Sequence, residues 1–312
     1  SWGSSYLLIK LILNEIPPAD IAMYRVLLGF LTTTAFIKSN KKIERKDHSL
    51  LALVGILWFT VPSFFYAVSL ESLSSSIVGI VNGTTPLIIA ALASLLFKEK
   101  INKYQVAYLM LGYLGIAILN IGILNNPEST TIGLLQALIA ALGYSLSVNI
   151  VKPLLSKYGS KITLKFSLLY GFLGNLIFYS PLLTFEIPKQ PINILSLLFL
   201  GIVGTGLAYY FYYELIIDIG VIRSTIIVYL IPVIAILFGV LLLYEAINGY
   251  EVLGLLVIIF SSFMFLLYER QKWLIFFTYK RRGVPEVKII SLRLKYEYVT
   301  ISNILLIGVL WT

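Results

Sequence analysis

The sequence predicts an all-α integral membrane protein with ten transmembrane helices, arranged as two inverted five-helix repeats. Three observations lead to this prediction: long apolar segments, charged residues confined to the connections between them, and an internal similarity at a shift of 146 positions. Hydrophobic residues make up 59% of the chain and charged residues 12%, whereas an ordinary soluble domain has about 25% charged residues. A chain of this composition is expected to have lipid as its solvent.

The apolar segments are of the right length to cross a bilayer, because a helix needs about 20 residues to span the hydrocarbon layer. Ten segments are expected to be helical, at residues 2–13, 18–37, 50–70, 72–97, 104–123, 131–155, 162–184, 192–217, 221–244 and 249–268. The first is short, so we expect it to be the remainder of a truncated helix, with no cleavable signal peptide before it. The single histidine, His48, is expected in a solvated loop.

Basic residues gather in alternate connections. If the N-terminus is cytoplasmic, the cytoplasmic connections carry most lysines and arginines, while the opposite ones carry mainly acids: Glu15, Asp20, Glu71, Glu128, Glu186 and Glu245. Short cytoplasmic loops are rich in Lys and Arg. We therefore predict a multi-pass protein of the cell membrane, with the N-terminus and residue 269 on the cytoplasmic side. The net charge of +9 is attributed to the membrane surface, and no nucleic acid partner is expected.

The internal similarity pairs polar and turn-forming residues as well as apolar ones. It aligns Pro86 with Pro232 and Glu99 with Glu245 at the same shift. Residues 1–126 are accordingly the first repeat, residues 127–268 the second, and residues 269–312 a basic tail with no predicted fold. Because each repeat has five crossings, the second enters the membrane in the opposite direction. Inverted repeats are typical of alternating-access transporters, which bind substrate between the repeats.

Several short motifs resemble one known family. Trp2-Gly3-Ser4-Ser5 is followed by Ile16-Pro17-Pro18 and Arg25, Thr85-Pro86-Leu87 leads to Phe97-Lys98-Glu99, and Tyr229-Leu230-Ile231-Pro232-Val233 leads to Leu243-Tyr244-Glu245. Together they resemble the drug/metabolite transporter (DMT) superfamily, EamA type, over residues 2–268. The resemblance implies a secondary active transporter with ten helices, often an exporter, of small metabolites, amino acids or drug-like compounds. The tail, which ends in a short apolar stretch at 298–311, lies outside it.

Polar and aromatic residues within the apolar segments are the candidates for substrate binding, because an unpaired polar group in hydrocarbon is costly. Aromatic faces bind rings or cations, and amides orient polar groups. The candidate substrate-binding residues are Trp2, Tyr6, Trp58, Tyr66, Asn82, Tyr144, Asn149, Tyr209, Tyr213 and Tyr229. Tyr and Trp also form belts at the membrane interface, which is the structural alternative for each of these aromatic residues.

Two prolines and three charged residues complete the candidates. Pro86 and Pro232 interrupt equivalent helices, so we expect them to act as paired gates. Lys10, Arg25 and Glu214 are interpreted as anchors at the membrane interface, which long side chains reach by snorkelling. Glu214 has a second interpretation, in which its carboxyl takes a coupling proton. Glu99 and Glu245 are expected to cap or lock a neighbouring helix end.

Other functions are less compatible with the sequence. A membrane enzyme would need clustered acids or histidines, and the 15 acids are scattered while the chain has no cysteine. We expect no catalytic residue, metal site or cofactor, and a small-molecule substrate in a monomer or homodimer within the lipid bilayer. A nucleotide-sugar or sugar-phosphate carrier of the same superfamily is an alternative, for which Lys10, Arg25 and Lys165 would bind phosphate. A non-transporting membrane scaffold is a remote one.

The topology can be tested directly, because the chain has no cysteine of its own. We expect single cysteines at Lys41 and Lys157 to react with a membrane-impermeant maleimide from the same side of the bilayer. Both lie in connections assigned to the cytoplasm by the distribution of basic residues. Labelling of the two positions from opposite sides would contradict the inverted arrangement of the two halves.

Overall fold

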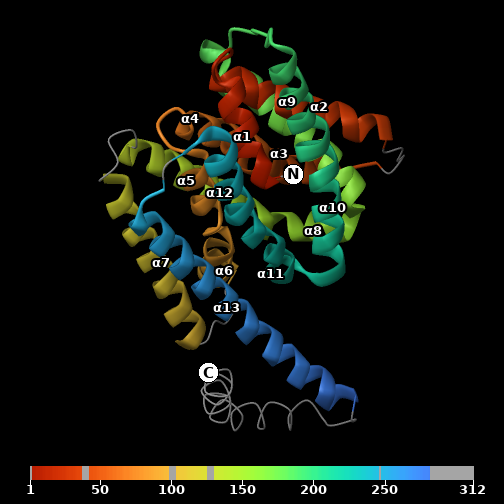
Figure 1. Cartoon of the computed structure of the whole chain (residues 1–312). Coiled ribbons are helices and arrows are strands. Elements are labelled where there is room, and N and C mark those ends of the chain that lie inside the picture. The colour runs from red at the N-terminus through yellow and green to blue at the C-terminus, as the bar shows by residue number, and fades with distance from the viewer. Residues whose placement is uncertain (1, 37–41, 98–102, 125–129, 246, 282–312) are drawn as a thin grey trace. The chain divides into compact units, whose positions relative to one another are not determined.

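The structure is a computed structural model, and it describes residues 2–36, 42–97, 103–124, 130–245 and 247–281. Within these residues every regular element is helical (Figure 1). The α-helices are α1 (Trp2–Ile12), α2 (Pro18–Phe36), α3 (His48–Gly55), α4 (Val61–Ser69), α5 (Ser75–Asn82), α6 (Thr85–Phe97), α7 (Lys103–Leu124), α8 (Thr131–Phe178), α9 (Pro191–Gly201), α10 (Ala208–Ile219), α11 (Val221–Ser224), α12 (Leu230–Leu243) and α13 (Gly249–Arg281).

Five shorter segments have other helical geometries. The π-helical segments η2 (Ile56–Thr60) and η4 (Ile202–Leu207) and the 3-10 segments η1 (Arg45–Asp47), η3 (Ser180–Leu182) and η5 (Thr225–Tyr229) lie between the α-helices. The chain divides into two compact units, Ser1–Phe263 and Met264–Thr312. In the second unit, the described residues are the last part of α13. The candidate site described below lies in the first unit.

Each apolar segment expected from the sequence falls on helical residues, with differences in detail. The segment at 162–184 runs past the helix, since α8 ends at Phe178. Gly159 breaks α8 in two with φ 77°, where the sequence places the connection between its sixth and seventh segments. His48 does not lie in a solvated loop, because it begins α3 and its Nδ1 lies 2.6 Å from the Tyr170 hydroxyl. The stretch at 298–311 lies outside the described residues.

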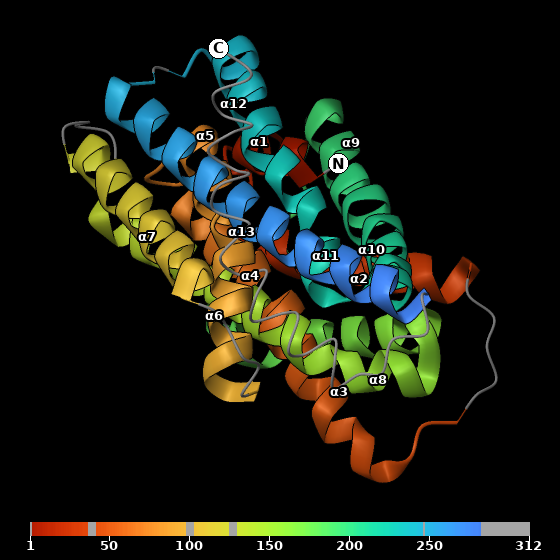
Figure 2. The ribbon, with the colours of Figure 1, turned by 90° about the horizontal axis from the view of Figure 1, so that it is seen from below.

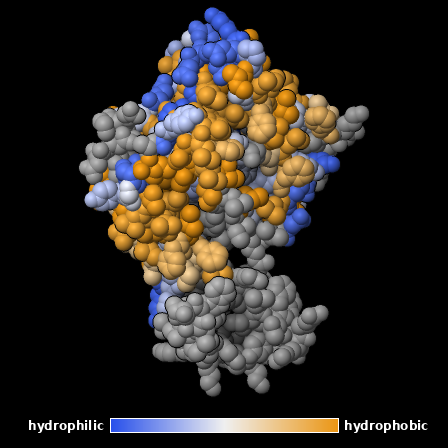
Figure 3. All heavy atoms as spheres, viewed as in Figure 1, coloured by the Kyte–Doolittle hydropathy of each residue, from blue (hydrophilic) through white to orange (hydrophobic). Residues whose placement is uncertain are grey.

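Four helical stretches of the described residues are long and apolar enough to cross a membrane: Arg45–Ser69, Ser75–Leu96, Thr131–Phe178 and Pro191–Asp218. This assignment rests on length and composition alone. Large apolar side chains are also exposed on the molecular surface, including Phe36, Leu95 and Ile132, which are 76%, 77% and 68% exposed. Apolar residues cover much of the described surface in Figure 3. Water does not favour such a surface, whereas lipid does.

Irregular backbone recurs at equivalent places in the two halves. The π-helical segments begin at Ile56 and Ile202, which are 146 positions apart, and α7 and α13 begin at Lys103 and Gly249, at the same separation. Each candidate gating proline follows a change in helical geometry. Helix α5 ends at Asn82, a turn follows, and Pro86 lies in the first turn of α6, where a proline costs no hydrogen bond. Pro232 lies in the first turn of α12, after η5.

Close backbone approach joins α5 to α12, which lie side by side in Figures 1 and 2. A Cβ atom added to Gly79 would lie 2.3 Å from the Ala235 Cβ, and one added to Gly83 would lie 2.6 Å from Pro232 Cγ. Helix α7 also packs closely on the part of α13 that belongs to the first unit, since a Cβ atom added to Gly115 would lie 2.7 Å from Ile258 Cγ1. Small residues let backbones pack closely in membranes, where apolar burial gives helices little reason to associate.

The crossing of α5 and α12 generates a stability prediction. We expect Gly79→Ala to lower the melting temperature of the detergent-solubilised protein, because overpacking costs about 1–3 kcal/mol and outweighs the better helix propensity of Ala. Gly204→Ala is the matched control, since its new Cβ would meet nothing closer than 3.6 Å. The exchange Gly79→Ala with Ala235→Gly should recover most of the loss. A double variant no more stable than Gly79→Ala would contradict this account of the crossing.

Candidate functional site

A cavity opens between helices of both halves of the chain. Its lining residues come from α1, α2, η2, α4, α5, α8, η4, α10 and α12: Trp2, Ser5, Tyr6, Arg25, Val26, Trp58, Phe59, Pro62, Ser63, Tyr66, Asn82, Tyr144, Thr205, Tyr209 and Ile231. Its empty volume is about 570 Å³, counting the part open to solvent. The space open to the centre of a water molecule is about 40 Å³, enough for about three waters. A larger ligand therefore has to widen the cavity.

The irregular segments supply part of the cavity wall. Trp58 and Phe59 lie on η2, and Thr205 lies on the equivalent segment η4. A π-helical turn shifts the register of the following side chains, and such turns often occur at functional sites. The carbonyl of Gly204 in η4 accepts a hydrogen bond of 2.9 Å from Trp2 Nε1, and so α1 is tied to the irregular turn of the second half.

Aromatic rings make up much of the wall and contact one another. The centroids of Trp2 and Tyr209 are 4.9 Å apart, and those of Trp58 and Tyr144 are 5.3 Å apart. Tyr6 packs edge-on against Tyr66 at 5.6 Å. Such edge-to-face and tilted pairs are the favoured arrangements of aromatic rings. They make a wall that is apolar on its faces and carries polar atoms at the ring edges.

Several polar atoms of this wall have no partner among the described residues. Trp58 Nε1, Tyr66 OH and Tyr144 OH are buried and make no hydrogen bond of normal geometry there. Asn82 differs, because its amide donates a hydrogen bond to the Tyr6 hydroxyl. Buried polar groups in proteins are nearly always hydrogen-bonded. These three groups on one cavity wall are therefore candidates for hydrogen bonds with a ligand.

Arg25 is the charged residue of the wall, and its predicted role as an interfacial anchor was wrong. Its side chain does not snorkel to a surface: the residue is 9% exposed, and its Nε donates a hydrogen bond of 2.9 Å to Thr205 Oγ1. The Thr205 hydroxyl donates in turn to the Leu200 carbonyl at 2.8 Å. Arg25 therefore links α2 in the first half to η4 in the second.

The sequence-predicted substrate-binding residues divide into three groups. Seven line the cavity: Trp2, Tyr6, Trp58, Tyr66, Asn82, Tyr144 and Tyr209. Tyr213 does not line it, because its ring is fully buried behind Trp58 at a centroid distance of 4.8 Å. Asn149 does not line it either, since its amide donates to the carbonyls of Ile89 and Ser145. The side chain of Tyr229 lies outside the described residues.

From the sequence, Arg25 was a binding residue only in the sugar-phosphate alternative, and Thr205 was not singled out at all. Thr205 stands between two glycines, a context that gives no sign of a buried hydrogen bond. The available signal was the internal similarity, because the shift of 146 aligns Phe59 with Thr205 and Thr60 with Gly206. The internal similarity could therefore have shown that residues of η2 and η4 occupy equivalent positions. It could not have shown the direction in which the Arg25 side chain points.

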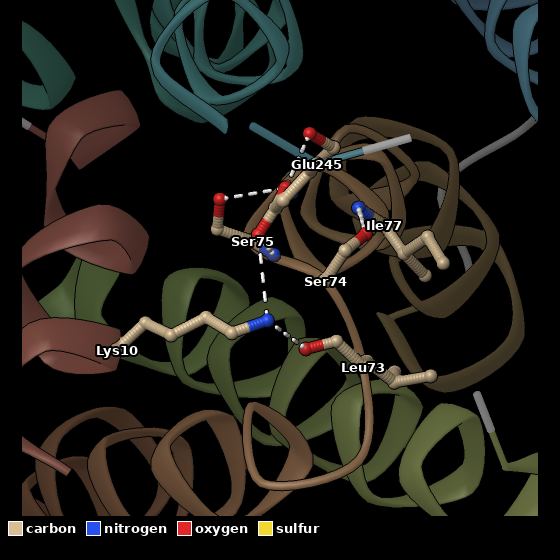
Figure 4. A network of polar contacts seen from close by, with 7 residues as sticks. Lys10, Leu73, Ser74, Ser75, Ile77 and Glu245 are labelled. Atoms are coloured by element: carbon tan, nitrogen blue, oxygen red, sulfur yellow. Dashed lines mark hydrogen bonds and ion pairs between the residues drawn. The ribbon is translucent and has the colours of Figure 1, made fainter. Parts of the chain in front are cut away.

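A second polar network connects the end of α1, the start of α5 and the residues that follow α12 (Figure 4). The Glu245 carboxylate accepts hydrogen bonds from the backbone N–H groups of Ser75 and Ser76, at 2.7 and 3.0 Å, and from both serine hydroxyls. Lys10 Nζ lies 3.4 Å from Glu245 Oε1 and donates to the Leu73 carbonyl at 3.2 Å. The expectation that Glu245 caps a neighbouring helix end is confirmed, while Glu99 lies outside the described residues.

The electrostatics of this network follow from the helix end that it covers. The N–H groups and positive dipole end of a helix stabilise a carboxylate. Burial raises the pKa of Glu245, but the hydrogen bonds from Ser75 and Ser76 and the nearby Lys10 ammonium outweigh it and hold this pKa below its ordinary value. Lys10 is therefore one partner of a partly buried ion pair rather than a free anchor.

The remaining charged candidates lie elsewhere in the first unit. Glu214 accepts a hydrogen bond from Ser160 Oγ on α8 and does not line the cavity. Asp20, at the start of α2, accepts bonds from the backbone of residues 184–186 and from the Thr184 hydroxyl. The described residues contain no cluster of three His, Cys, Asp or Glu side chains suited to a metal ion.

The EamA-like transporter family matches two stretches of this chain, residues 1–121 and 131–267. The chain therefore belongs to the EamA-like transporter family, which places it among membrane transporters. The resemblance to the drug/metabolite transporter superfamily noted from the short motifs is confirmed.

Similar proteins carry transporter names. An "Uncharacterized transporter" of Archaeoglobus fulgidus is 25% identical over 81% of this chain and 90% of its own length. The "Uncharacterized transporter YoaV" of Bacillus subtilis is 25% identical over 84% and 92%, and the "Uncharacterized inner membrane transporter YedA" of Escherichia coli K12 is 27% identical over 83% and 85%. A solved structure titled "Crystal structure of protein" superposes with a TM-score of 0.60 at 20% identity, covering 86% of this chain and 96% of that one. It shares the fold.

The depressed pKa of Glu245 generates a prediction for thermal stability. A carboxyl whose pKa is lower in the folded state stabilises the fold above its unfolded pKa of about 4.3, and this contribution is lost as the pH falls through the folded value. We expect Glu245→Gln to cost about 1.5–3 kcal/mol at pH 7, as for hydrogen bonds to charged groups. The difference in melting temperature between wild type and variant should shrink as the pH falls below about 4.

The matched control is Glu186→Gln, because Glu186 is exposed and contributes only its backbone N–H to a described hydrogen bond. This variant should match the wild type at each pH. A Glu245→Gln variant whose melting temperature stayed parallel to that of the wild type from pH 7 to pH 3 would disprove the role assigned to the ionised carboxylate.

Proposed function

We propose that this chain is a secondary active transporter that moves a small metabolite, amino acid or drug-like compound by alternating access, with export as its direction. The observation that carries the proposal is the cavity between the two halves, with aromatic rings, buried polar atoms without partners, and Arg25 in its wall. Ligand sites of this kind are concave and largely apolar, with a few placed polar groups that fix orientation.

The two-repeat architecture belongs to this proposal. It is supported by the recurrence of π-helical turns and helix starts at a shift of 146 positions, and by the two separate stretches that the family matches. Ten crossings, an inverted second repeat and cytoplasmic termini are the remaining parts of the proposal. Cavities between inverted repeats, lined by interrupted helices, are the usual substrate sites of such transporters.

The polar network at one end of the cavity supports an alternating mechanism. Lys10 and Glu245 tie α1 and α12 to the start of α5, and the proposed topology places them at the outer face. We infer that the outer end is closed in this conformation and that the ion pair separates when the outer end opens. The turn before Pro86 and the 3-10 segment η5 before Pro232 would be the hinges of that motion, which is the gating role expected of the two prolines.

Glu214 keeps its predicted role in proton coupling within this proposal. Its hydrogen bond with Ser160 joins α10 to α8, and Glu214 is not among the residues that line the cavity. Protonation there would act through helix positions and not through direct contact with the substrate.

Access to the cavity can be measured in proteoliposomes with a membrane-impermeant maleimide. Ser63 lines the cavity and is 7% exposed, so a single cysteine at Ser63 reports whether reagent reaches it. In the otherwise wild-type chain we expect labelling mainly from the face opposite the Lys10–Glu245 pair. Adding Lys10→Met should raise labelling from the closed face several-fold, because the ion pair that holds this end shut is lost.

Ser156→Cys is the control, because Ser156 is exposed and is not among the cavity-lining residues, so its labelling should not respond to Lys10→Met. Equal labelling of Ser63→Cys from both faces at once would indicate a channel and contradict the transporter. Labelling that did not respond to Lys10→Met would contradict the assigned closure.

A further inference from the structure

The buried guanidinium of Arg25 carries an inference about the class of substrate, and this inference rests on the proposed function. Arg25 projects from α2 into the cavity wall and is 9% exposed. Its Nε–H is directed to Thr205 Oγ1, which fixes the plane of the group. A guanidinium has five N–H donors, and the described residues account for only this one.

The positive charge of Arg25 is not compensated by an acid among the described residues. The ion pairs of this part of the chain join Lys10, Lys46 and Lys157 to other carboxylates. Asp20, five residues before Arg25 on α2, is fully buried, and its carboxylate is taken up by hydrogen bonds from residues 184–186. An unpaired buried charge is costly, and an anion that binds it in a bidentate manner removes that cost.

The rest of the cavity wall restricts which other charged groups the anion can carry. No carboxylate is among the described residues that line the cavity, so a substrate ammonium group would find no counter-charge there. A phosphate dianion calls for more than one cation, and Lys10 is engaged with Glu245 while the Lys165 side chain does not line the cavity. Trp58 Nε1 and the hydroxyls of Tyr66 and Tyr144, which make no hydrogen bond of normal geometry within the described residues, can donate to an acceptor on the ligand.

We propose that the cavity binds a small monocarboxylate with an apolar or aromatic body and no charged amine. Its carboxylate pairs with the two terminal nitrogens of Arg25, and its body packs among the aromatic rings around Trp58. The same geometry argues against the sugar-phosphate alternative, because one guanidinium matches one carboxylate in charge and in shape.

Four probes that share a phenyl ring test this proposal on the purified full chain. They are 3-phenylpropionate, its neutral amide, 3-phenylpropylamine and phenyl phosphate, compared by thermal shift over a concentration series. A ligand that binds the folded state raises its melting temperature in proportion to its affinity. We expect 3-phenylpropionate to bind about 10- to 100-fold more tightly than the other three, the range for loss of a charged hydrogen-bonded pair.

Variants at Arg25 distinguish a binding role from a merely structural one. Arg25→Gln should lose the preference for 3-phenylpropionate over its amide, whereas Arg25→Lys should retain part of it, since the charge remains but the bidentate geometry does not. Lys161→Gln, which removes an exposed charge on α8, is the matched control and should keep the full preference. If Arg25→Gln does not fold, the order of affinities of the four probes for the wild type still tests the proposal.

Three results would overturn the proposal: tighter binding of the amine or the phosphate than of the carboxylate, equal binding of carboxylate and amide, or no stabilisation by any of the four. Transport of another compound class in proteoliposomes would then leave the proposed function standing. Conversely, Arg25-dependent binding of 3-phenylpropionate without its counterflow across proteoliposomes would support the carboxylate site and refute transport of that class.

Discussion

The carboxylate of Glu245 holds together the helices on which the cavity depends. It covers the start of α5 through Ser75 and Ser76 and pairs with Lys10 of α1, while its own backbone N–H bonds to Gly239 near the end of α12. The first N–H groups of a helix have no partner within the helix and need an acceptor from elsewhere. A single ion can therefore serve as cap, as charge partner and as link between the two halves, and the close contact of Gly79 with Ala235 places α5 where the link can form.

The cavity lies where the backbone departs from regular α-helix. The π-helical turns η2 and η4 and the turn after Asn82 all border it. Irregular backbone is tolerated at membrane depth only where protein or a polar cavity satisfies its hydrogen bonds, and here side chains do so: Trp2 bonds the Gly204 carbonyl, and Thr205 bonds the Leu200 carbonyl. Irregular turns, aromatic wall and the Arg25 guanidinium thus form one polar and aromatic region inside an otherwise apolar helical unit.

Particular residues show how far the candidate site could be predicted. Trp2 and Tyr6 were identified as aromatic residues within an apolar segment, and both line the cavity. Tyr213 met the same criterion but faces the packed interior, because residue type alone does not say which neighbour covers a side chain. Arg25 was misjudged as an interfacial anchor because its long side chain, about two turns into α2, can point either to the membrane interface or to the protein interior. Its bond to Thr205, 180 positions away, decided between them.

The sequence by itself determined the membrane class, the positions of the helices and the internal similarity, because apolar length, loop charge and repeated Pro and Glu residues are local properties that need no knowledge of neighbours. Only the tertiary structure decided which aromatic residues meet, where the backbone leaves α-helical geometry, and that one arginine lies in the cavity without an acidic partner among the described residues. All three features depend on how helices from both halves pack together. The partners in these contacts are more than 150 residues apart in the sequence, so local sequence patterns do not reveal them.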